Sequence, residues 1–206
     1  YTLAAEESDP TGWYDSGWAS RKRITLNRGK VYGAHANFPV LVNLTTDTDL
    51  AADAQNDGDD LLFTSSDGTT KLSHEIEKFD GATGQLVAWV KVPSLSSSTD
   101  TVLYLYYGNG AAASQQNATA VWDSNFKGVW HLKEDPAVAG ANGIIDSTSN
   151  ANHGTASGAM NAADQVAGQV DGSLDFDGTD DYVPAGTAFF GPSSAEDLTG
   201  SAWVNI

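Results

Sequence analysis

The chain has 206 residues, of which 40% are hydrophobic, so it is long enough and apolar enough for one or two packed domains. Asp and Glu number 27 against 10 Lys and Arg, and the resulting formal charge of -17 argues against nucleic acid or an anionic membrane as a partner. There is no cysteine, which excludes disulfides and thiolate metal sites, and no apolar run approaches the roughly 20 residues needed for membrane insertion as a helix.

The first half of the chain predicts strands separated by turns. Residues 1–12 are small and acidic and end in D-P-T-G, so we expect a leader or linker there. Strands are predicted over Arg21–Leu26 and Phe38–Thr45, followed by one short helical turn over Asp49–Gln55. The segment Asp57–Thr70 indicates a strand held between two Asp-Gly turns.

Three further strands have the clearest apolar alternation, and they cover Leu72–Phe79, Leu86–Val92 and Thr101–Tyr107. The segment P-S-L-S-S-S-T-D joins the last two and is too long for a tight hairpin, so these strands either pair directly or cross between sheets. No run of 11 or more residues has helical periodicity, and no repeat is visible, which favours an all-β fold.

The composition changes at Val121–Leu132, which carries Trp122 and Trp130. The sequence before it is rich in predicted strands, and the sequence after it is rich in Gly, Asp and Asn. We therefore predict a β-sandwich domain over residues 13–120 and a second β-unit over residues 121–206.

Within the second unit, the sequence predicts a polar loop over Ile144–Thr155 and a hairpin over Ser173–Val183. The last residues, A-W-V-N-I, have the composition of a strand that would find no partner within this chain.

Seven motifs in order resemble a prokaryotic surface-protein domain known only as a domain of unknown function. They lie between about residues 13 and 131 and read R-K-R-I-T-L, F-P-V-L-V, D-G-D-D-L-L-F-T, E-I-E, L-V-A-W-V-K-V-P, L-Y-L-Y-Y-G-N and V-W-H-L. From Val129 on, V-W-H-L, I-D-S-T-S-N-A-N-H-G-T, S-L-D-F-D-G-T-D-D-Y-V and S-A-W-V resemble the opening of a laminin-G-like, concanavalin A-type jelly roll. The resemblance implies an all-β chain: a jelly-roll-like β-sandwich followed by an incomplete concanavalin A-like (laminin-G-like) β-unit, with an extracellular or cell-surface location and a binding role.

The chain left after Val129 is shorter than a complete jelly roll needs. Three explanations are open: the chain is a fragment of a longer protein, its tail completes the first domain's sheet, or another subunit supplies strands by edge addition. We favour a fragment.

Aromatic side chains on two predicted strands suggest a ligand site. If the aliphatic faces of the strands form the core, Trp89, Tyr104 and Tyr106 lie on the other faces and could form a platform that stacks on sugar rings. The alternative is that a neighbouring sheet or domain covers them, as is more common for large aromatic residues.

Two groups of carboxylates are candidates for catalysis or for metal binding. Glu75 and Glu77 share a predicted strand face, which could serve a glycosidase, but we interpret the pattern as a solvated strand face and assign no catalytic residue. The turn that holds Asp177, Asp180 and Asp181 offers the oxygen ligands that Ca²⁺ prefers, so these residues are candidate calcium ligands or, alternatively, ordinary turn aspartates.

The remaining polar motifs carry little chemistry. His35, His74, His131 and His153 are scattered without metal-binding spacing, so zinc is not predicted. The basic cluster Arg21–Arg23 is interpreted as a charged guard on an edge strand or as an internal set of counter-ions.

Together these observations predict a non-catalytic extracellular binding or adhesion module that recognises a polysaccharide, a surface glycan or another surface partner. Two alternatives stay open: a structural subunit of a surface filament or layer, whose partners are other copies of itself joined by strand donation, and an accessory domain of a polysaccharide-degrading enzyme.

Overall fold

The computed structural model describes residues 1–6, 12–185 and 199–205, which form two compact units, residues 1–123 and 124–206. In its described residues the first unit contains eight strands and three short helices: β1 (Thr2–Glu6), β2 (Ser20–Leu26), η1 (Arg28–Lys30), β3 (His35–Leu44), α1 (Thr48–Asp53), β4 (Leu62–Ser65), β5 (Lys71–Leu72), β6 (His74–Asp80), β7 (Gln85–Leu95), β8 (Thr101–Tyr107) and α2 (Ala118–Val121). None of the helices in the described part of the chain is long and apolar enough to cross a membrane.

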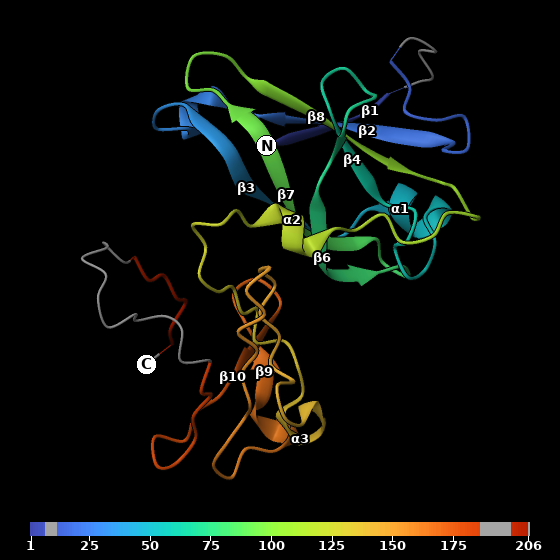
Figure 1. Ribbon diagram of the computed structural model, residues 1–206. Coiled ribbons are helices and arrows are strands. Elements are labelled where there is room, and N and C mark those ends of the chain that lie inside the picture. The colour runs from blue at the N-terminus through green and yellow to red at the C-terminus, as the bar shows by residue number, and fades with distance from the viewer. Residues whose placement is uncertain (7–11, 186–198, 206) are drawn as a thin grey trace. The chain divides into compact units, whose positions relative to one another are not determined.

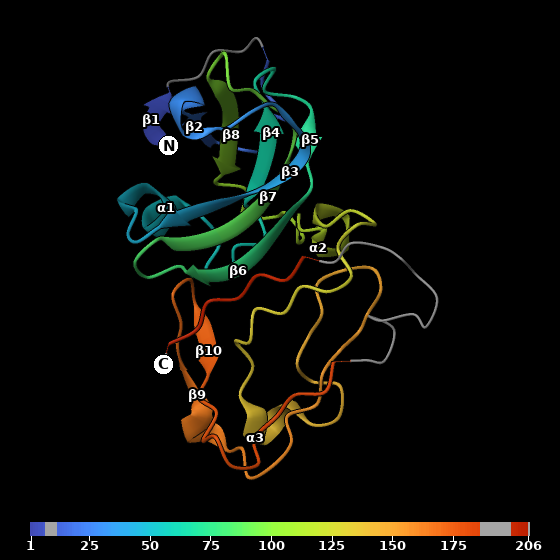
Figure 2. The ribbon, with the colours of Figure 1, turned by 90° about the vertical axis from the view of Figure 1, so that its left-hand side faces the viewer.

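The strands of the first unit form two antiparallel sheets that pack as a sandwich (Figure 1). One sheet has the order β1-β2-β8-β4-β5 and the other the order β3-β7-β6, and Figure 2 shows them as separate layers. The prediction of an all-β sandwich is therefore confirmed. Since β7 and β8 lie in different sheets, the Ser-rich segment between them is a crossover and not a hairpin.

The core of the sandwich consists of the side chains that alternate inward from both sheets. In β7 they are Leu86, Ala88, Val90 and Val92, and they face inward residues of β8 and β2. This alternation was predicted, and it follows from the period of two along a strand. The other fully or nearly buried members of the core are Ile24, Leu26, Val42, Leu44, Leu50, Leu61, Phe63, Leu72, Leu95, Leu103, Leu105 and Tyr107.

Both ends of the first unit differ from the sequence-based boundaries. Part of the predicted leader forms β1, which pairs with β2 from Thr2 opposite Thr25 to Glu6 opposite Arg21, so β2 is not an edge strand. At the other end, Val121 and Trp122 are buried within the first unit and do not open the second. The apolar contacts of these residues, invisible in a one-dimensional pattern, decide where the unit ends.

Both edges of the three-stranded sheet are partly occupied. In β3, Pro39 offers no N–H, and the hydroxyl of Tyr1 accepts a hydrogen bond from the backbone N–H of Asn43 and donates one to its carbonyl. Along β6, the backbone N–H of Asn117 donates to the carbonyl of His74 at 2.9 Å, and the N–H of Ile76 donates to a side-chain oxygen at 2.7 Å. These contacts limit the backbone groups available to an added strand.

The second unit has little regular structure. It contains α3 (Pro136–Ala139), η2 (Ala162–Asp164), β9 (Gln165–Ala167) and β10 (Gly172–Leu174). Two predictions were wrong here. The strand β10 pairs with the preceding β9 and not with a later half of Ser173–Val183, and the described final residues 201–205 are not a strand. The later half of Ser173–Val183 and residues 201–205 have suitable composition, but neither forms a strand in the described part of the chain.

A buried aspartate organises the loop that begins the second unit. Asp146 accepts hydrogen bonds from the backbone N–H groups of Val129, Thr148 and Asn152, each at 2.9 Å, and from the Thr148 hydroxyl at 2.8 Å. Its own N–H donates to the ring of His153. The motifs V-W-H-L and I-D-S-T-S-N-A-N-H are thus joined by one buried carboxylate.

Candidate functional site

Two members of the predicted aromatic platform lie on the outer face of the five-stranded sheet. Tyr106 is fully buried and Tyr104 is half-buried, because the segment before β2 folds back over them. The Trp13 ring meets Tyr106 edge-on with ring centroids 5.1 Å apart, and the Trp18 side chain packs in the same cluster. These tyrosines are therefore packed and not displayed.

Arg21 lies at the centre of this cluster. Its guanidinium carbon is 4.3 Å from the Tyr104 ring centroid and 4.8 Å from that of Trp13, which are cation–π distances. One guanidinium nitrogen donates to the Tyr106 hydroxyl at 3.0 Å and to the carbonyl of Gly12 at 2.8 Å. The first residue of the basic cluster is thus neither an edge guard nor a surface charge.

The third member, Trp89, lies on the other sheet of the sandwich. Its indole N–H donates to a carboxylate oxygen of Glu77 at 2.7 Å, and its ring lies 5.3 Å from that of Trp122. Trp89 belongs to β7, whereas the two tyrosines belong to β8, and the core separates the outer faces of the two sheets. The prediction of one shared platform was wrong, because the crossover after β7 was not fixed by the sequence.

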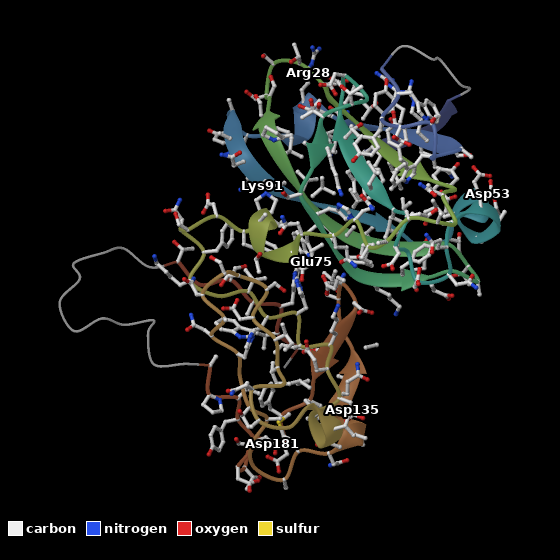
Figure 3. The ribbon with its side chains drawn as sticks, turned by 45° about the vertical axis from the view of Figure 1, so that its right-hand side comes forward. Arg28, Asp53, Glu75, Lys91, Asp135 and Asp181 are labelled. Carbon is white, nitrogen blue, oxygen red and sulfur yellow. The ribbon has the colours of Figure 1, made fainter. Side chains whose placement is uncertain are left out.

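Glu75 and Glu77 are also buried, with 7% and 6% of their surfaces exposed, so the predicted solvated strand face was wrong. Trp122 donates its indole N–H to Glu75 at 2.9 Å, and Figure 3 shows Glu75 beside α2. Each carboxylate therefore accepts a hydrogen bond from a tryptophan. The burial of Glu75 was not predicted because its hydrogen-bond donor, Trp122, lies 47 residues later in the sequence.

The predicted calcium ligands do come together. Carboxylate oxygens of Asp177, Asp180 and Asp181 lie within 4.8 Å of one another, in the loop that carries the Asp181 label in Figure 3. The Asp177 carboxylate accepts the N–H of Thr179 at 2.7 Å, which holds the pKa of Asp177 below its ordinary value. Three carboxylates supply part of the six to eight oxygens that Ca²⁺ takes, and such exposed groups are also common without a metal.

A polar depression of about 300 Å³ lies beside β5 and the start of β6. Hydroxyl, amide and ammonium groups line it, and the sequence analysis did not single it out. The run S-Q-Q-N at residues 114–117, which follows a Gly/Ala-rich stretch, was the available signal. The lining residues are Lys71, Leu72, Ser73, Ser114, Gln115, Gln116 and Asn117.

Hydrogen bonds fix part of this depression and leave the rest open. The Lys71 ammonium donates to the side-chain oxygen of Gln115 at 2.6 Å, and the side-chain oxygen of Gln116 accepts the N–H of Ile76. Partial desolvation lowers the pKa of Lys71. Ser114, Gln116 through its amide nitrogen, and Asn117 make no other side-chain hydrogen bond among the described residues, so their donors are available to a ligand.

The motif D-G-D-D has a structural role at its last residue. The carboxylate of Asp60 is fully buried and accepts hydrogen bonds from the backbone N–H groups of Gln55, Gly108 and Asn109 at 2.7–2.9 Å. It therefore ties the turn before β4 to the residues that end β8.

Comparison with known proteins gives one finding. Neither a search of curated proteins nor a search of solved structures found a match. Residues 57–133, which include β4 to β8 and α2, match the sequence model of a family described as a domain of unknown function, DUF2341.

Proposed function

We propose that this chain is a non-catalytic extracellular binding module that recognises a glycan through hydrogen bonds in the polar depression. The observation that carries the proposal is the lining itself: exposed amides and hydroxyls with open donors, all within the part of the chain that matches DUF2341. Sugar hydroxyls donate and accept in pairs, and amide and hydroxyl side chains match both roles.

The depression would bind by hydrogen bonding and not by stacking, since none of its lining residues is aromatic. Lys71 adds one positive charge beside the amides, which favours a ligand that carries carboxylate or sulfate groups. A shallow polar site of this kind supports modest affinity at one site, and several copies on one polymer would raise it.

The non-catalytic part of the proposal is supported by the two glutamates that most resembled a glycosidase pair. Glu75 and Glu77 are buried, and each accepts an indole N–H, so neither is presented to a substrate in the described structure. A general acid must reach the glycosidic oxygen, and a nucleophile must reach the anomeric carbon.

For the second unit we propose the beginning of a laminin-G-like jelly roll that holds Ca²⁺ at Asp177, Asp180 and Asp181. The support is the grouping of three carboxylates in one loop and the short antiparallel pair β9–β10. The ion would draw two successive aspartates and the preceding turn together.

Assembly by strand donation stays a prediction of the sequence. The edges of the three-stranded sheet are partly occupied, so they are poor acceptors for a donated strand. The edge strands of the five-stranded sheet are β1 and β5, and β5 has only two residues to which a donated strand could pair. We therefore rank binding above assembly.

Affinity electrophoresis on a panel of neutral, uronic-acid-containing and sulfated polysaccharides tests the proposal. We expect retention on at least one polymer and its loss in a variant with Ser114→Ala and Asn117→Ala. Neither side chain makes a hydrogen bond that holds the described fold, so this variant should remain folded. Gln169→Ala, an exposed amide of the second unit, is the control and should be retained like the wild type. Absence of retention on every polymer would contradict the proposal.

A further inference from the structure

Lys22 is an unusual residue in the sandwich because its side chain points toward the core. It lies opposite Leu105 in the register of β2 and β8, on the same strand face as Ile24 and Leu26, which are core residues. Only 8% of its side chain is exposed. A buried ammonium needs a partner, and the partners here are carboxylates.

The Lys22 ammonium contacts both carboxylate oxygens of Asp47, whose side chain is also 8% exposed. A second carboxylate, that of Asp49, has one oxygen 2.9 Å from the same nitrogen, and its side chain is half exposed. One buried amine, one buried carboxyl and one solvent-accessible carboxyl therefore meet at a single point. An ion pair needs only the first two groups, whereas amide formation also uses a third group that accepts and returns protons.

The position of Asp47 is fixed from several sides. Its backbone N–H donates to the carbonyl of Thr83 at 3.0 Å, and its carboxylate caps α1 by accepting the N–H of Leu50 at 3.0 Å. Gly84, at a φ of +67°, approaches so closely that a β-carbon there would lie 1.9 Å from the Asp47 carbonyl oxygen. The Asp47 carboxylate is thus held in place against Lys22, which is itself fixed by its position in β2, an internal strand of the five-stranded sheet.

We propose that Lys22 and Asp47 are a site of covalent modification, at which the lysine amine condenses with the aspartate carboxyl to form an intramolecular isopeptide bond. The bond would join β2 of one sheet to the N-cap residue of α1, three residues after the end of β3 in the other sheet. This inference does not depend on the glycan-binding proposal.

The reaction balances without any external reagent. Asp49 takes a proton from the lysine ammonium and passes it to the Asp47 carboxylate, and the neutral amine then attacks Cγ of protonated Asp47. The Nζ–Cγ bond forms, one Cγ–Oδ bond breaks, and that oxygen leaves as water with two of the three ammonium protons. One hydrogen stays on the amide nitrogen, and the remaining Asp47 oxygen still caps α1.

Two physical factors set the rate and the yield. Fixed geometry gives well-oriented intramolecular reactions effective molarities of about 10⁵–10⁸ M, which favours the amide over the separated groups. Burial alone would lower the pKa of Lys22, but hydrogen bonds with Asp47 and Asp49 outweigh it, and the pKa lies above its ordinary value. The resting lysine amine is therefore protonated, and bond formation is a slow event that needs to occur once.

Intact mass spectrometry of the denatured full chain is the test. We expect a mass about 18 Da below that of the sequence, which is the loss of one water, and a branched peptide that contains Lys22 and Asp47 after digestion. Lys22→Arg keeps the charge and the ion pair but cannot form this amide, so it should have the full mass. Asp49→Asn should slow the water loss by about a hundredfold or more.

Each other outcome overturns the inference or one of its parts. A folded wild type that keeps its full mass after prolonged incubation overturns the bond. Loss of water that persists in Lys22→Arg places it elsewhere, for example at the Asp-Gly pairs that cyclise to succinimides, and also overturns the bond. An unchanged rate in Asp49→Asn removes Asp49 from the mechanism.

Discussion

Arg21 and Tyr106 lie opposite each other on neighbouring strands, and the guanidinium donates to the phenol oxygen at 3.0 Å. The same hydroxyl donates to the carbonyl of Gly68 at 2.9 Å and accepts the backbone N–H of Tyr14 at 3.2 Å. One phenol thus connects the sheet, the turn before β5 and the segment before β2. Tyr106 is a structural residue, although its composition and position suggested a ligand platform.

Tyr106→Phe should lower the free energy of unfolding by about 1–3 kcal/mol, because it leaves buried polar partners without their hydrogen bond. Tyr104→Phe is the matched control, since the Tyr104 hydroxyl makes no hydrogen bond with another described residue, and its effect should lie within about 0.5 kcal/mol. Urea unfolding monitored by tryptophan fluorescence measures both. Equal effects of the two substitutions would contradict the structural role.

Strands β7 and β8 show which structural properties the sequence could predict. The alternation of Leu86 to Val92 and of Leu103 to Tyr107 is a local property, so the inward faces of β7 and β8 were predicted correctly. The sheet to which each strand belongs is not local. Trp89 was therefore placed with Tyr104 and Tyr106, although the crossover puts them on opposite sides of the core.

The candidate sites also differ in whether their residues are close together in the sequence. Asp177, Asp180 and Asp181 come together because they share one tight loop, which spacing can predict. The hydrogen bond of Glu75 comes from Trp122, the residue after α2 and 47 positions away in the sequence, and the depression depends on residues 114–117 meeting β5. No short-range pattern encodes either contact, because each is made by tertiary packing.

Asp60→Asn should lower the free energy of unfolding by about 2–3 kcal/mol. The buried carboxylate accepts three backbone N–H groups, and an amide would replace one acceptor with a donor that faces them. Asp59→Asn, in the same turn, has no side-chain hydrogen bond among the described residues and serves as the control. Thermal unfolding followed by circular dichroism distinguishes them, and a similar loss in both variants would contradict this assignment.

His74 should make the fold sensitive to acid. The ring lies buried between the sheets, 5.3 Å from the ring of Phe63, and neither nitrogen makes a hydrogen bond of ordinary geometry, although the backbone of Leu72 and of Leu61 favours the charged form. Burial lowers the pKa of His74 to about 4, and the positive charge of Lys71 acts in the same direction.

Because the folded pKa lies below the unfolded value of 6.5, the unfolded state binds the proton first. The contribution of neutral His74 to the free energy of unfolding is fully present above pH 6.5. This free energy falls by about 3 kcal/mol as the pH drops toward 4. Urea unfolding at a series of pH values should show a smaller decrease for His74→Leu than for the wild type. The exposed His35→Gln variant should behave like the wild type, and identical pH dependence of all three proteins would rule out His74 as the cause.

Calcium should bind to the second unit with a dissociation constant of about 10⁻⁴–10⁻³ M, the range of extracellular modules. Asp180→Asn removes a central carboxylate of the group and should abolish the heat of binding in a calorimetric titration. Asp175→Asn changes an exposed aspartate of the same loop outside the group and should keep the heat. Binding that survives Asp180→Asn would place calcium elsewhere.

The most direct test of the glycan-binding proposal is the dissociation constant of the polysaccharide that the wild type retains best, measured by calorimetry. For the variant with Ser114→Ala and Asn117→Ala we expect affinity at least about tenfold lower, a change of about 1.4 kcal/mol, while Gln169→Ala keeps the wild-type value. Equal affinity of the wild type and the double variant, with both proteins folded, would contradict the assignment of the polar depression as the binding site.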